Sequence, residues 1–188
     1  MKADIDELVF LLEEKSAKEV LKNGLIQQLV PENIAIRYIV FEGKQDLEKG
    51  ISRKLKAWMN KRAVFVIMRD QDSEDNCIQL KQRLAQKCTE AGKPDTLIRI
   101  VCRELESWYL GDLQAVETGL KVSGLAKKQT KYPRPDSRNN AKQELIRLSK
   151  NQYQSVSGSR RISPYLNLDN NTSVSFRVFV EGVRRLFQ

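Results

Sequence analysis

Histidine is absent from this chain of 188 residues, and its absence excludes several kinds of catalytic site. A serine or cysteine nucleophile that needs a histidine base cannot be built, and neither can a zinc centre with histidine ligands. A nuclease with a histidine general base is excluded for the same reason. Any hydrolytic chemistry must therefore rest on carboxylates, a metal ion and the side chains of lysine or arginine.

Cysteine is scarce, and long apolar runs are missing. The three cysteines, Cys77, Cys88 and Cys102, are odd in number and lack the spacing of metal ligands, so we expect reduced thiols. No apolar stretch approaches the ~20 residues that a membrane-spanning helix needs. Residues 1–7 are acidic and do not have the pattern of a signal peptide. We therefore expect a cytoplasmic protein without a membrane partner.

Charge is abundant and unbalanced. Lysine and arginine number 33 against 24 aspartates and glutamates, which gives a net charge of +9. A basic field on a chain with 40% hydrophobic residues favours an anionic partner, most often nucleic acid. Clusters of acidic residues in such a chain are informative, because carboxylates repel phosphates unless a metal ion lies between them.

Apolar runs and amphipathic segments alternate through the first half of the chain. The apolar runs have the length of strands, and the segments between them have apolar residues at helical spacing. The runs cover residues 8–12, 34–41, 63–68 and 96–102, and the amphipathic segments cover residues 15–29, 46–59 and 77–88. This alternation is typical of a parallel sheet joined by right-handed crossovers. We therefore predict an α/β fold with a parallel four-stranded sheet and flanking helices.

The second half of the chain has a different pattern. Segments with helical character cover residues 108–120, 143–148 and 173–187, and a basic stretch rich in loop-forming residues lies between the first two. We therefore predict an α/β domain over residues 1–106 and a C-terminal helical lobe over residues 107–188 that packs on it.

Acidic residues follow each of the predicted strands. The carboxyl ends of parallel strands lie at one edge of a sheet, where ligands bind in open α/β folds. Convergent carboxylates at this edge suit a hard cation such as Mg²⁺ or Mn²⁺. The segments concerned are Glu13-Glu14, Glu42-Gly43-Lys44, Asp70-Gln71-Asp72 and Glu104-Leu105-Glu106.

The carboxylates at this edge have different predicted roles. Asp70 and Asp72 are predicted to hold the metal ion, with Glu106 facing the same cleft as a further ligand. Glu13 is a predicted ligand or catalytic base. Glu14 is the alternative catalytic carboxylate, because successive side chains alternate in direction and only one of the two can point into the site.

Four basic residues are predicted to contact a phosphate-containing substrate, namely Lys44, Arg69, Arg160 and Arg161. Lys44 belongs to a glycine–lysine pair that lacks the rest of a P-loop, so nucleotide binding of that type is excluded. Structural interpretations compete with these roles. The aspartate pair can cap the next helix, the two glutamates can favour a helix N-terminus, and the arginine pair can be a solvated face.

The order of the acidic motifs resembles the Toprim fold, the metal-binding catalytic domain of topoisomerases, primases and overcoming-lysogenization-defect nucleases. More closely, four segments look like the bacterial, Toprim-like domain-of-unknown-function family 4276. They are Phe10-Leu-Leu-Glu-Glu-Lys-Ser-Ala-Lys-Glu19, Phe41-Glu-Gly-Lys-Gln-Asp46, Arg69-Asp-Gln-Asp-Ser73 and Cys102-Arg-Glu-Leu-Glu-Ser-Trp-Tyr-Leu-Gly-Asp112. The resemblance covers nearly the whole chain, and the last segment is its most specific part.

The resemblance implies roles for individual residues. Glu13 matches the Toprim acid, the pair Asp70 and Asp72 matches the metal ligands, and Glu106 with Asp112 belongs to an additional acidic motif. Many relatives have glycine after the first glutamate, where this chain has a second glutamate. The resemblance also implies a place in phage defence beside an ABC-type or AAA ATPase.

We therefore predict a Mg²⁺- or Mn²⁺-dependent nuclease that cleaves phosphodiester bonds of nucleic acid, DNA or RNA. Two alternatives stay open: a non-catalytic nucleic-acid-binding or regulatory subunit, and a metal-dependent nucleotide phosphohydrolase. The chain has no evident ATPase motif, so activation is expected from a partner. Apolar surface near Phe176 and Phe179 is a candidate docking face, and the alternative is that both residues pack in the core.

Overall fold

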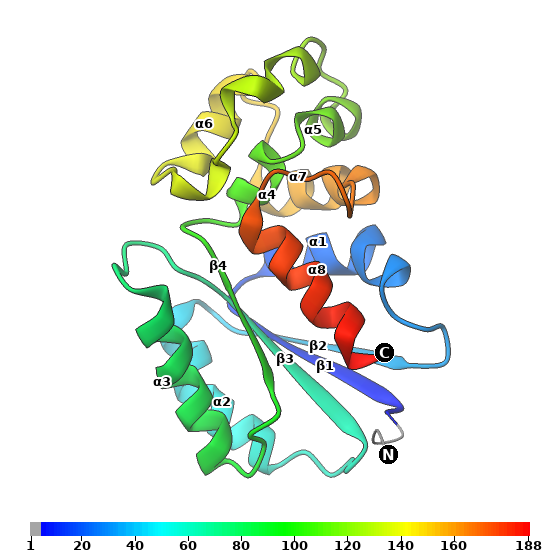
Figure 1. Ribbon diagram of the computed structural model, residues 1–188, viewed down its shortest axis with the longest axis vertical. Coiled ribbons are helices and arrows are strands. Elements are labelled where there is room, and N and C mark those ends of the chain that lie inside the picture. The colour runs from blue at the N-terminus through cyan, green and yellow to red at the C-terminus, as the bar shows by residue number, and fades with distance from the viewer. Residues whose placement is uncertain (1–4) are drawn as a thin grey trace.

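A computed structural model describes residues 5–188; the first four residues, on which part of the signal-peptide expectation rests, lie outside the described part. Four parallel strands lie at its centre in the order β2-β1-β3-β4 (Figure 1). They are β1 (Glu7–Leu12), β2 (Ala35–Val40), β3 (Ala63–Asp70) and β4 (Leu97–Val101). Both neighbours of β1 run parallel to it, with its last residue Leu12 opposite Val40 of β2 and Met68 of β3. The chain thus reverses its direction of winding beside β1, which is a topological switch point.

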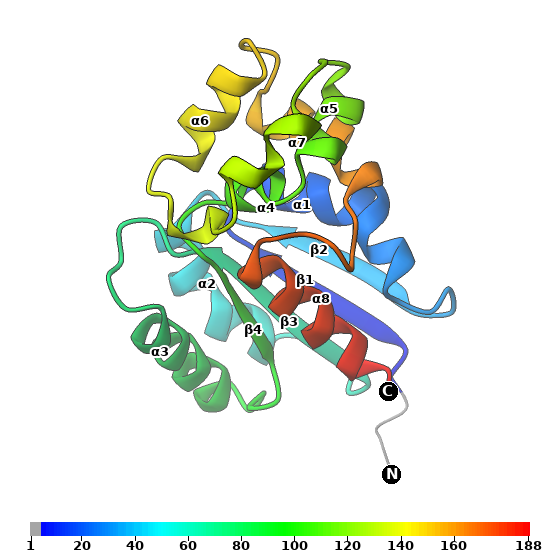
Figure 2. The same cartoon turned by 45° about the horizontal axis from the view of Figure 1, so that its top comes forward.

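The two central strands are continuous apolar runs because helices cover both faces of the sheet. On one face, α2 (Lys44–Lys56) and α3 (Cys77–Glu90) pack on side chains such as Leu11 and Ile67. On the other face, α1 (Lys15–Val20) and α8 (Val174–Leu186) pack on side chains such as Phe10 and Val66. Figure 2 shows α8, the last helix, lying alongside the sheet.

Four further helices gather at the carboxyl end of the strands (Figure 1). They are α4 (Glu106–Leu110), α5 (Leu113–Leu120), α6 (Ala141–Leu148) and α7 (Ser155–Ile162). Their apolar side chains belong to the same hydrophobic cluster as α1, α8 and one face of the sheet. Trp108 of α4 packs on Phe176 and Phe179 of α8 at ring-centroid distances of 5.2 and 5.1 Å. The hydrophobic core is therefore continuous across the predicted boundary between residues 106 and 107.

Two predicted helices are interrupted. In the segment 15–29 the α-helix ends at Val20, and the short turns η1 (Leu21–Leu25) and η2 (Ile26–Gln28) follow. Within η1 the backbone leaves helical geometry at Asn23 and Gly24, and the φ of Gly24 is 143°. A Cβ on Gly24 would lie 2.8 Å from the Cα of Pro164, so glycine permits both this backbone angle and the close approach. The segment 108–120 is divided where Asp112 accepts a hydrogen bond from the Ala115 N–H and begins α5.

The region between α5 and α8 contains a helix that periodicity did not predict. Residues 121–140 form irregular chain with the short 3₁₀ turns η3 (Ala126–Lys131) and η4 (Pro135–Ser137), as expected for the basic stretch. Helix α7 was missed because its sequence, rich in serine and arginine, carries few apolar residues. Among the described residues, no helix has the length and apolar character needed to cross a membrane.

Candidate active site at the carboxyl edge of the sheet

Glu13 lies directly after β1 and reaches the neighbouring strand β3. Its Oε2 accepts a hydrogen bond from the backbone N–H of Asp70 at 3.2 Å. The Nε of Arg69 is 3.9 Å from the same oxygen. Burial raises the pKa of Glu13 to about 7, and repulsion from the Asp72 carboxylate adds to the rise. The second carboxylate oxygen of Glu13 is therefore a site for a proton or a cation near neutral pH.

Asp70 ends β3, and its Oδ2 accepts a hydrogen bond from the backbone N–H of Leu105 at 3.0 Å. Burial raises the pKa of Asp70 well above its ordinary value. Repulsion from Glu106, Glu14 and Glu13 raises it further. The hydrogen bond from Leu105 opposes these effects without offsetting them, so negative charge on Asp70 is poorly compensated by the protein itself.

Asp72 lies in the loop after β3 and is held by both neighbouring segments. The Lys44 Nζ, at the start of α2, is 3.1 Å from its Oδ2. Its backbone N–H donates to the Arg103 carbonyl at 2.8 Å, while Nη1 of Arg103 donates to the Asp72 carbonyl at 3.4 Å. Both residues have left-handed backbone angles, with φ of 54° and 62°. Such angles are uncommon outside glycine and mark a tightly specified loop pair.

Glu106 approaches the same edge from α4 but is almost fully buried, with 4% of its surface exposed. The Tyr153 hydroxyl donates a hydrogen bond to its Oε1 at 2.9 Å. Burial raises its pKa to about 7, and the charge of Glu14 contributes to that rise. Glu106 therefore adds to the electrostatic strain on Asp70 from the interior side.

Glu14 is exposed at the first turn of α1, where it accepts a hydrogen bond from the Ser16 hydroxyl. Its charge is one of the causes of the raised pKa values of Asp70 and Glu106. Of the two adjacent glutamates, Glu13 is the one that contacts the β3 backbone. The structure therefore brings Glu13 closest to the aspartates, with Glu14 at the rim.

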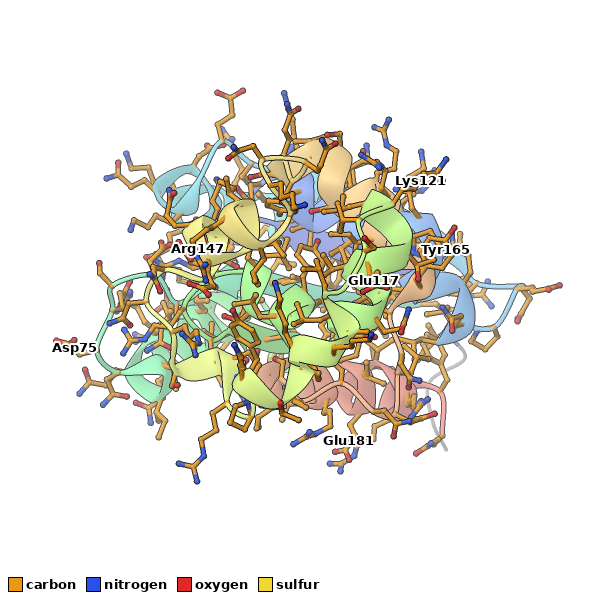
Figure 3. The ribbon with its side chains drawn as sticks, turned by 90° about the horizontal axis from the view of Figure 1, so that it is seen from above. Asp75, Glu117, Lys121, Arg147, Tyr165 and Glu181 are labelled. Carbon is orange, nitrogen blue, oxygen red and sulfur yellow. The ribbon has the colours of Figure 1, made fainter. Side chains whose placement is uncertain are left out.

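A cavity of about 600 Å³ opens beside Asp72. Its lining mixes both signs of charge and comprises Lys44, Asp72, Ser73, Asp75, Arg103, Glu104 and Asn139. Figure 3 shows Asp75 at the outer margin of the molecule, on the loop that leads to α3. Cationic side chains beside a carboxylate provide the two kinds of group that a phosphodiester bound through a cation would contact.

The donor chemistry of this edge fits a hard divalent cation. Within residues 5–188 no group of three or more histidine, cysteine, aspartate or glutamate side chains is arranged to hold a metal ion. Mg²⁺, however, commonly uses only one or two protein carboxylates and completes its shell with water and phosphate oxygens. The raised pKa values of Glu13 and Asp70 indicate carboxylates whose negative charge is not fully offset by neighbouring cations. Glu13, Asp70 and Asp72 are the residues that would hold such an ion.

Arg69 lies behind the strand-end carboxylates, with its side chain in the interior of the protein. Only 1% of its side chain is exposed, and its guanidinium is 3.0 Å from Glu48 of α2 and 2.8 Å from Glu74. It therefore neutralises partly buried carboxylates behind the site, and its direct contact with a substrate stays a prediction that this placement does not favour. Nothing in the sequence next to Asp70 distinguishes such an interior arginine from an exposed one.

Arg160 and Arg161 are also engaged within the protein. Arg160 pairs with Glu19 of α1 at 2.7 Å. Arg161 donates to the carbonyls of Gly119 and Leu120 at 3.1 and 2.8 Å, and so caps the C-terminus of α5. Both join α7 to its neighbours, and neither lines the cavity beside Asp72.

Other residues of the acidic motifs are structural. The Asp112 carboxylate caps α5 and accepts from the Asn167 N–H at 2.8 Å. Glu104 accepts from the Lys142 N–H at 2.9 Å, in the first turn of α6.

Phe176 and Phe179 are fully buried, so the proposed docking face at these two residues is wrong and the core interpretation is correct.

The sequence did not identify Arg103, Tyr153 and Glu48 as members of the site or its support. Tyr153 and Glu106 come from segments far apart in the chain, so only the fold brings them together. Arg103 sits inside a recognised motif, and its basic side chain beside two acidic residues was the available signal.

The chain was compared with protein families and solved structures. The model of the family described as Domain of unknown function (DUF4276) matches residues 12–184. The C-terminal region of the Burkholderia pseudomallei OLD protein is similar with a TM-score of 0.57 and 13% identity, over 98% of this chain and 100% of that one. The C-terminal region of the Xanthomonas campestris pv. campestris OLD protein is similar with a TM-score of 0.52 and 12% identity, over 95% of this chain and 94% of that one. No curated protein matches the chain.

Identities this low establish a shared fold and nothing finer. The strand order, the flanking helices and the structural similarity together confirm the predicted α/β Toprim-like class.

Proposed function

The chain belongs to the DUF4276 family, and from that premise we propose that it is a metal-dependent phosphodiesterase that cleaves nucleic acid. One observation carries the proposal: Glu13 and Asp70 meet across adjacent parallel strands at the switch point, and both have raised pKa values. Ligand sites in open α/β sheets form at this place. Buried, mutually repelling carboxylates are costly unless they serve a cation or a proton.

A bound Mg²⁺ or Mn²⁺ would supply charge stabilisation for a phosphodiester and would lower the pKa of water. The chain's own groups complete the task. Glu13, with a pKa of about 7, can accept a proton at the oxygen that Asp70 N–H does not occupy. Lys44 and Arg103, which line the cavity beside Asp72, can neutralise substrate phosphates. Asp70 and Asp72 would provide the carboxylates that hold the ion.

A regulatory subunit without catalysis is the second candidate, and one observation favours it. The Lys44 ammonium occupies one oxygen of Asp72, and no set of three ligands is assembled among the described residues. A protein whose edge is closed in this way would bind nucleic acid or a partner without cleaving. The ATPase partner and the place in phage defence stay predictions that rest on the family resemblance.

Cleavage assays separate the two candidates. The purified chain is incubated with Mn²⁺ or Mg²⁺ and single-stranded DNA, duplex DNA, RNA or nucleoside triphosphates. We expect metal-dependent cleavage of a polynucleotide, lost in Asp70→Asn and retained in Asp169→Asn, a control in which 75% of the side chain is exposed. Cleavage of nucleotides alone would favour the phosphohydrolase alternative. Metal-dependent binding without cleavage of any substrate would favour the regulatory subunit.

A further inference from the structure

The outer edge of β4 is open. Among the described residues no strand lies beyond β4 in the sheet order. The carbonyl groups of Val101 and Arg103 accept hydrogen bonds from the loop that continues β3, from Gln71 and Asp72. Since backbone groups of successive residues face opposite sides of a strand, those of Ile98 and Ile100 face outward. An unpaired edge of this kind is a template for pairing with another strand.

An apolar groove of about 400 Å³ runs beside this edge, between α3 and α8. Figures 1 and 2 show β4 with α3 on one side and α8 on the other. Ile78 of α3 and Val178 of α8, which line it, are 64% and 46% exposed, unusual values for side chains of this size. The groove therefore offers apolar pockets on both sides of an open strand.

The charged side chains that line the groove are cationic. Nη1 of Arg99 donates to the outward-facing carbonyl of its neighbour Ile98 at 3.0 Å, and its Nε is buried without a partner. The guanidinium lies so close to α8 that a Cβ on Gly182 would be 2.1 Å from Nη2. Burial and repulsion from Arg185 lower the pKa of Arg99, and attraction to Glu181 opposes them without offsetting them. Lys81 adds a second positive charge from α3.

The acidic residue that acts on Arg99, Glu181, already has a cationic partner. Glu181, labelled on α8 in Figure 3, pairs with Arg185 at 3.1 Å. An occupant that brings a carboxylate would therefore supply the hydrogen-bond partner that the Arg99 Nε lacks.

We propose that the edge of β4 binds an extended segment of a partner protein in which apolar and acidic residues alternate. Backbone groups of the segment would pair with those of Ile98 and Ile100, as in recognition by strand addition. One set of its side chains would enter the apolar groove on the α3 side, and the alternate set, its carboxylates, would lie on the α8 side of the strand, where they would face Arg99. A second copy of this chain is disfavoured as the occupant. Pairing β4 with β4 of another copy would bring the Arg99 side chains of the two copies close together, and like charges across a strand pair repel.

Peptide binding tests the proposal with the full chain. The probe is a short, acetylated, fluorescent peptide of alternating valine and glutamate, and the comparison peptide has lysine in place of glutamate. We expect saturable binding of the glutamate peptide by fluorescence anisotropy and slower hydrogen exchange of the Ile98 and Ile100 amides in its presence. N-methylation of alternate peptide nitrogens, which removes the donors needed for pairing, should abolish both effects.

Variants locate the surface. Ile78→Asp should weaken binding of the glutamate peptide by about tenfold or more, which corresponds to about 1.4 kcal/mol. Val156→Asp alters another exposed apolar residue, 40% exposed on α7 and outside the groove, and should leave binding unchanged. The proposal is overturned by equal binding of the two peptides, by no binding of the glutamate peptide, by unchanged exchange at Ile98 and Ile100, or by a concentration-dependent dimer that Ile78→Asp dissociates.

Discussion

Two clusters of charged side chains lie at the carboxyl edge of the sheet, and they differ in their balance of charge. Behind β3, Arg69 and Arg83 pair with Glu48 and Glu74 at distances of 2.8 to 3.6 Å. A hydrogen bond from Arg83, assisted by one from Arg69, lowers the pKa of Glu74. In the second cluster, in front of the switch point, burial and mutual repulsion raise the pKa values of Glu13 and Asp70.

The difference separates charges that stabilise the fold from charges that serve a ligand. The first cluster has a cation for its carboxylates, and it holds α2 and the loop after β3 in position. The second has carboxylates in excess, with Lys44 on Asp72 and Arg69 at 3.9 Å from Glu13 as the nearby cations. Perturbed groups that converge at a ligand-binding edge are typical of functional sites.

The largest expected effect comes from removing the cation of the balanced cluster. Arg69→Met would remove a fully buried cation that the partly buried carboxylates of Glu13, Glu48 and Glu74 share, and would leave the last two with the half-exposed Arg83 alone. We expect the free energy of unfolding to fall by ~3–5 kcal/mol, measured by urea denaturation. The matched variant Arg83→Met, at an arginine whose side chain is 45% exposed, should cost less than ~1 kcal/mol. A similar small loss for both variants would show that the two clusters do not differ as described.

A smaller effect, of opposite sign, is expected in the unbalanced cluster. The pKa of Glu106 is about 7 in the folded chain against an ordinary value of 4.5. Between these values the folded chain binds more protons than the unfolded chain, so the free energy of unfolding falls as the pH rises through this range. Glu106→Gln keeps an acceptor for the Tyr153 hydroxyl and removes the charge. We expect this variant to exceed the native chain in stability at pH 8 by up to ~3 kcal/mol and to match it at pH 4.5.

The measurement is urea denaturation across this pH range, with Glu181→Gln as a control at an exposed glutamate. The control should follow the native pH profile. If Glu106→Gln is destabilised at pH 8, Glu106 is stabilised in its charged form and does not contribute to the strain on Asp70.

The smallest effect on stability is expected at Lys44, which links the acidic site to α2. The Lys44 side chain is 44% exposed and that of Asp72 34% exposed, so Lys44→Met should change the free energy of unfolding by less than ~1 kcal/mol. Its expected effect on metal binding is larger, because the ammonium competes for the Asp72 oxygen. Calorimetric titration of Mg²⁺ should show tighter binding by the variant. Weaker binding would mean that Lys44 supports the metal site.

The sequence was sufficient to predict the sheet, because buried parallel strands are continuous apolar runs such as residues 8–12 and 63–68. The convergence of Glu13 with Asp70 followed from the same pattern, since parallel strand ends share one edge. The direction in which a single side chain points, and its burial, could not be predicted from this pattern. The local sequence around Arg69 does not show whether its side chain points to solvent or into the protein. Glu48 is distant from Arg69 in the chain, and only the fold places the two side chains 3.0 Å apart.

The C-terminal half was harder to predict for a physical reason. Helix α7 is stabilised by tertiary contacts, among them the Tyr109 hydroxyl, which donates to Ser159 at 2.7 Å, and the caps formed by Arg161. Such contacts leave little apolar periodicity in a segment of eight residues. Arg160 and Arg161, for which the sequence suggested contact with nucleic acid, form ion pairs or hydrogen bonds within the protein.

Metal-dependent thermal stability tests the central claim, that Glu13, Asp70 and Asp72 form an unbalanced site for a divalent cation. At pH 8, Mg²⁺ or Mn²⁺ at 100 times the dissociation constant should add ~2.7 kcal/mol to stability, and each kcal/mol should raise the melting temperature by about 2–4 °C. We predict this rise for the native chain and for Asp169→Asn, and its loss in Asp70→Asn. A melting temperature unchanged by either ion, or an equal rise in Asp70→Asn, would contradict the account.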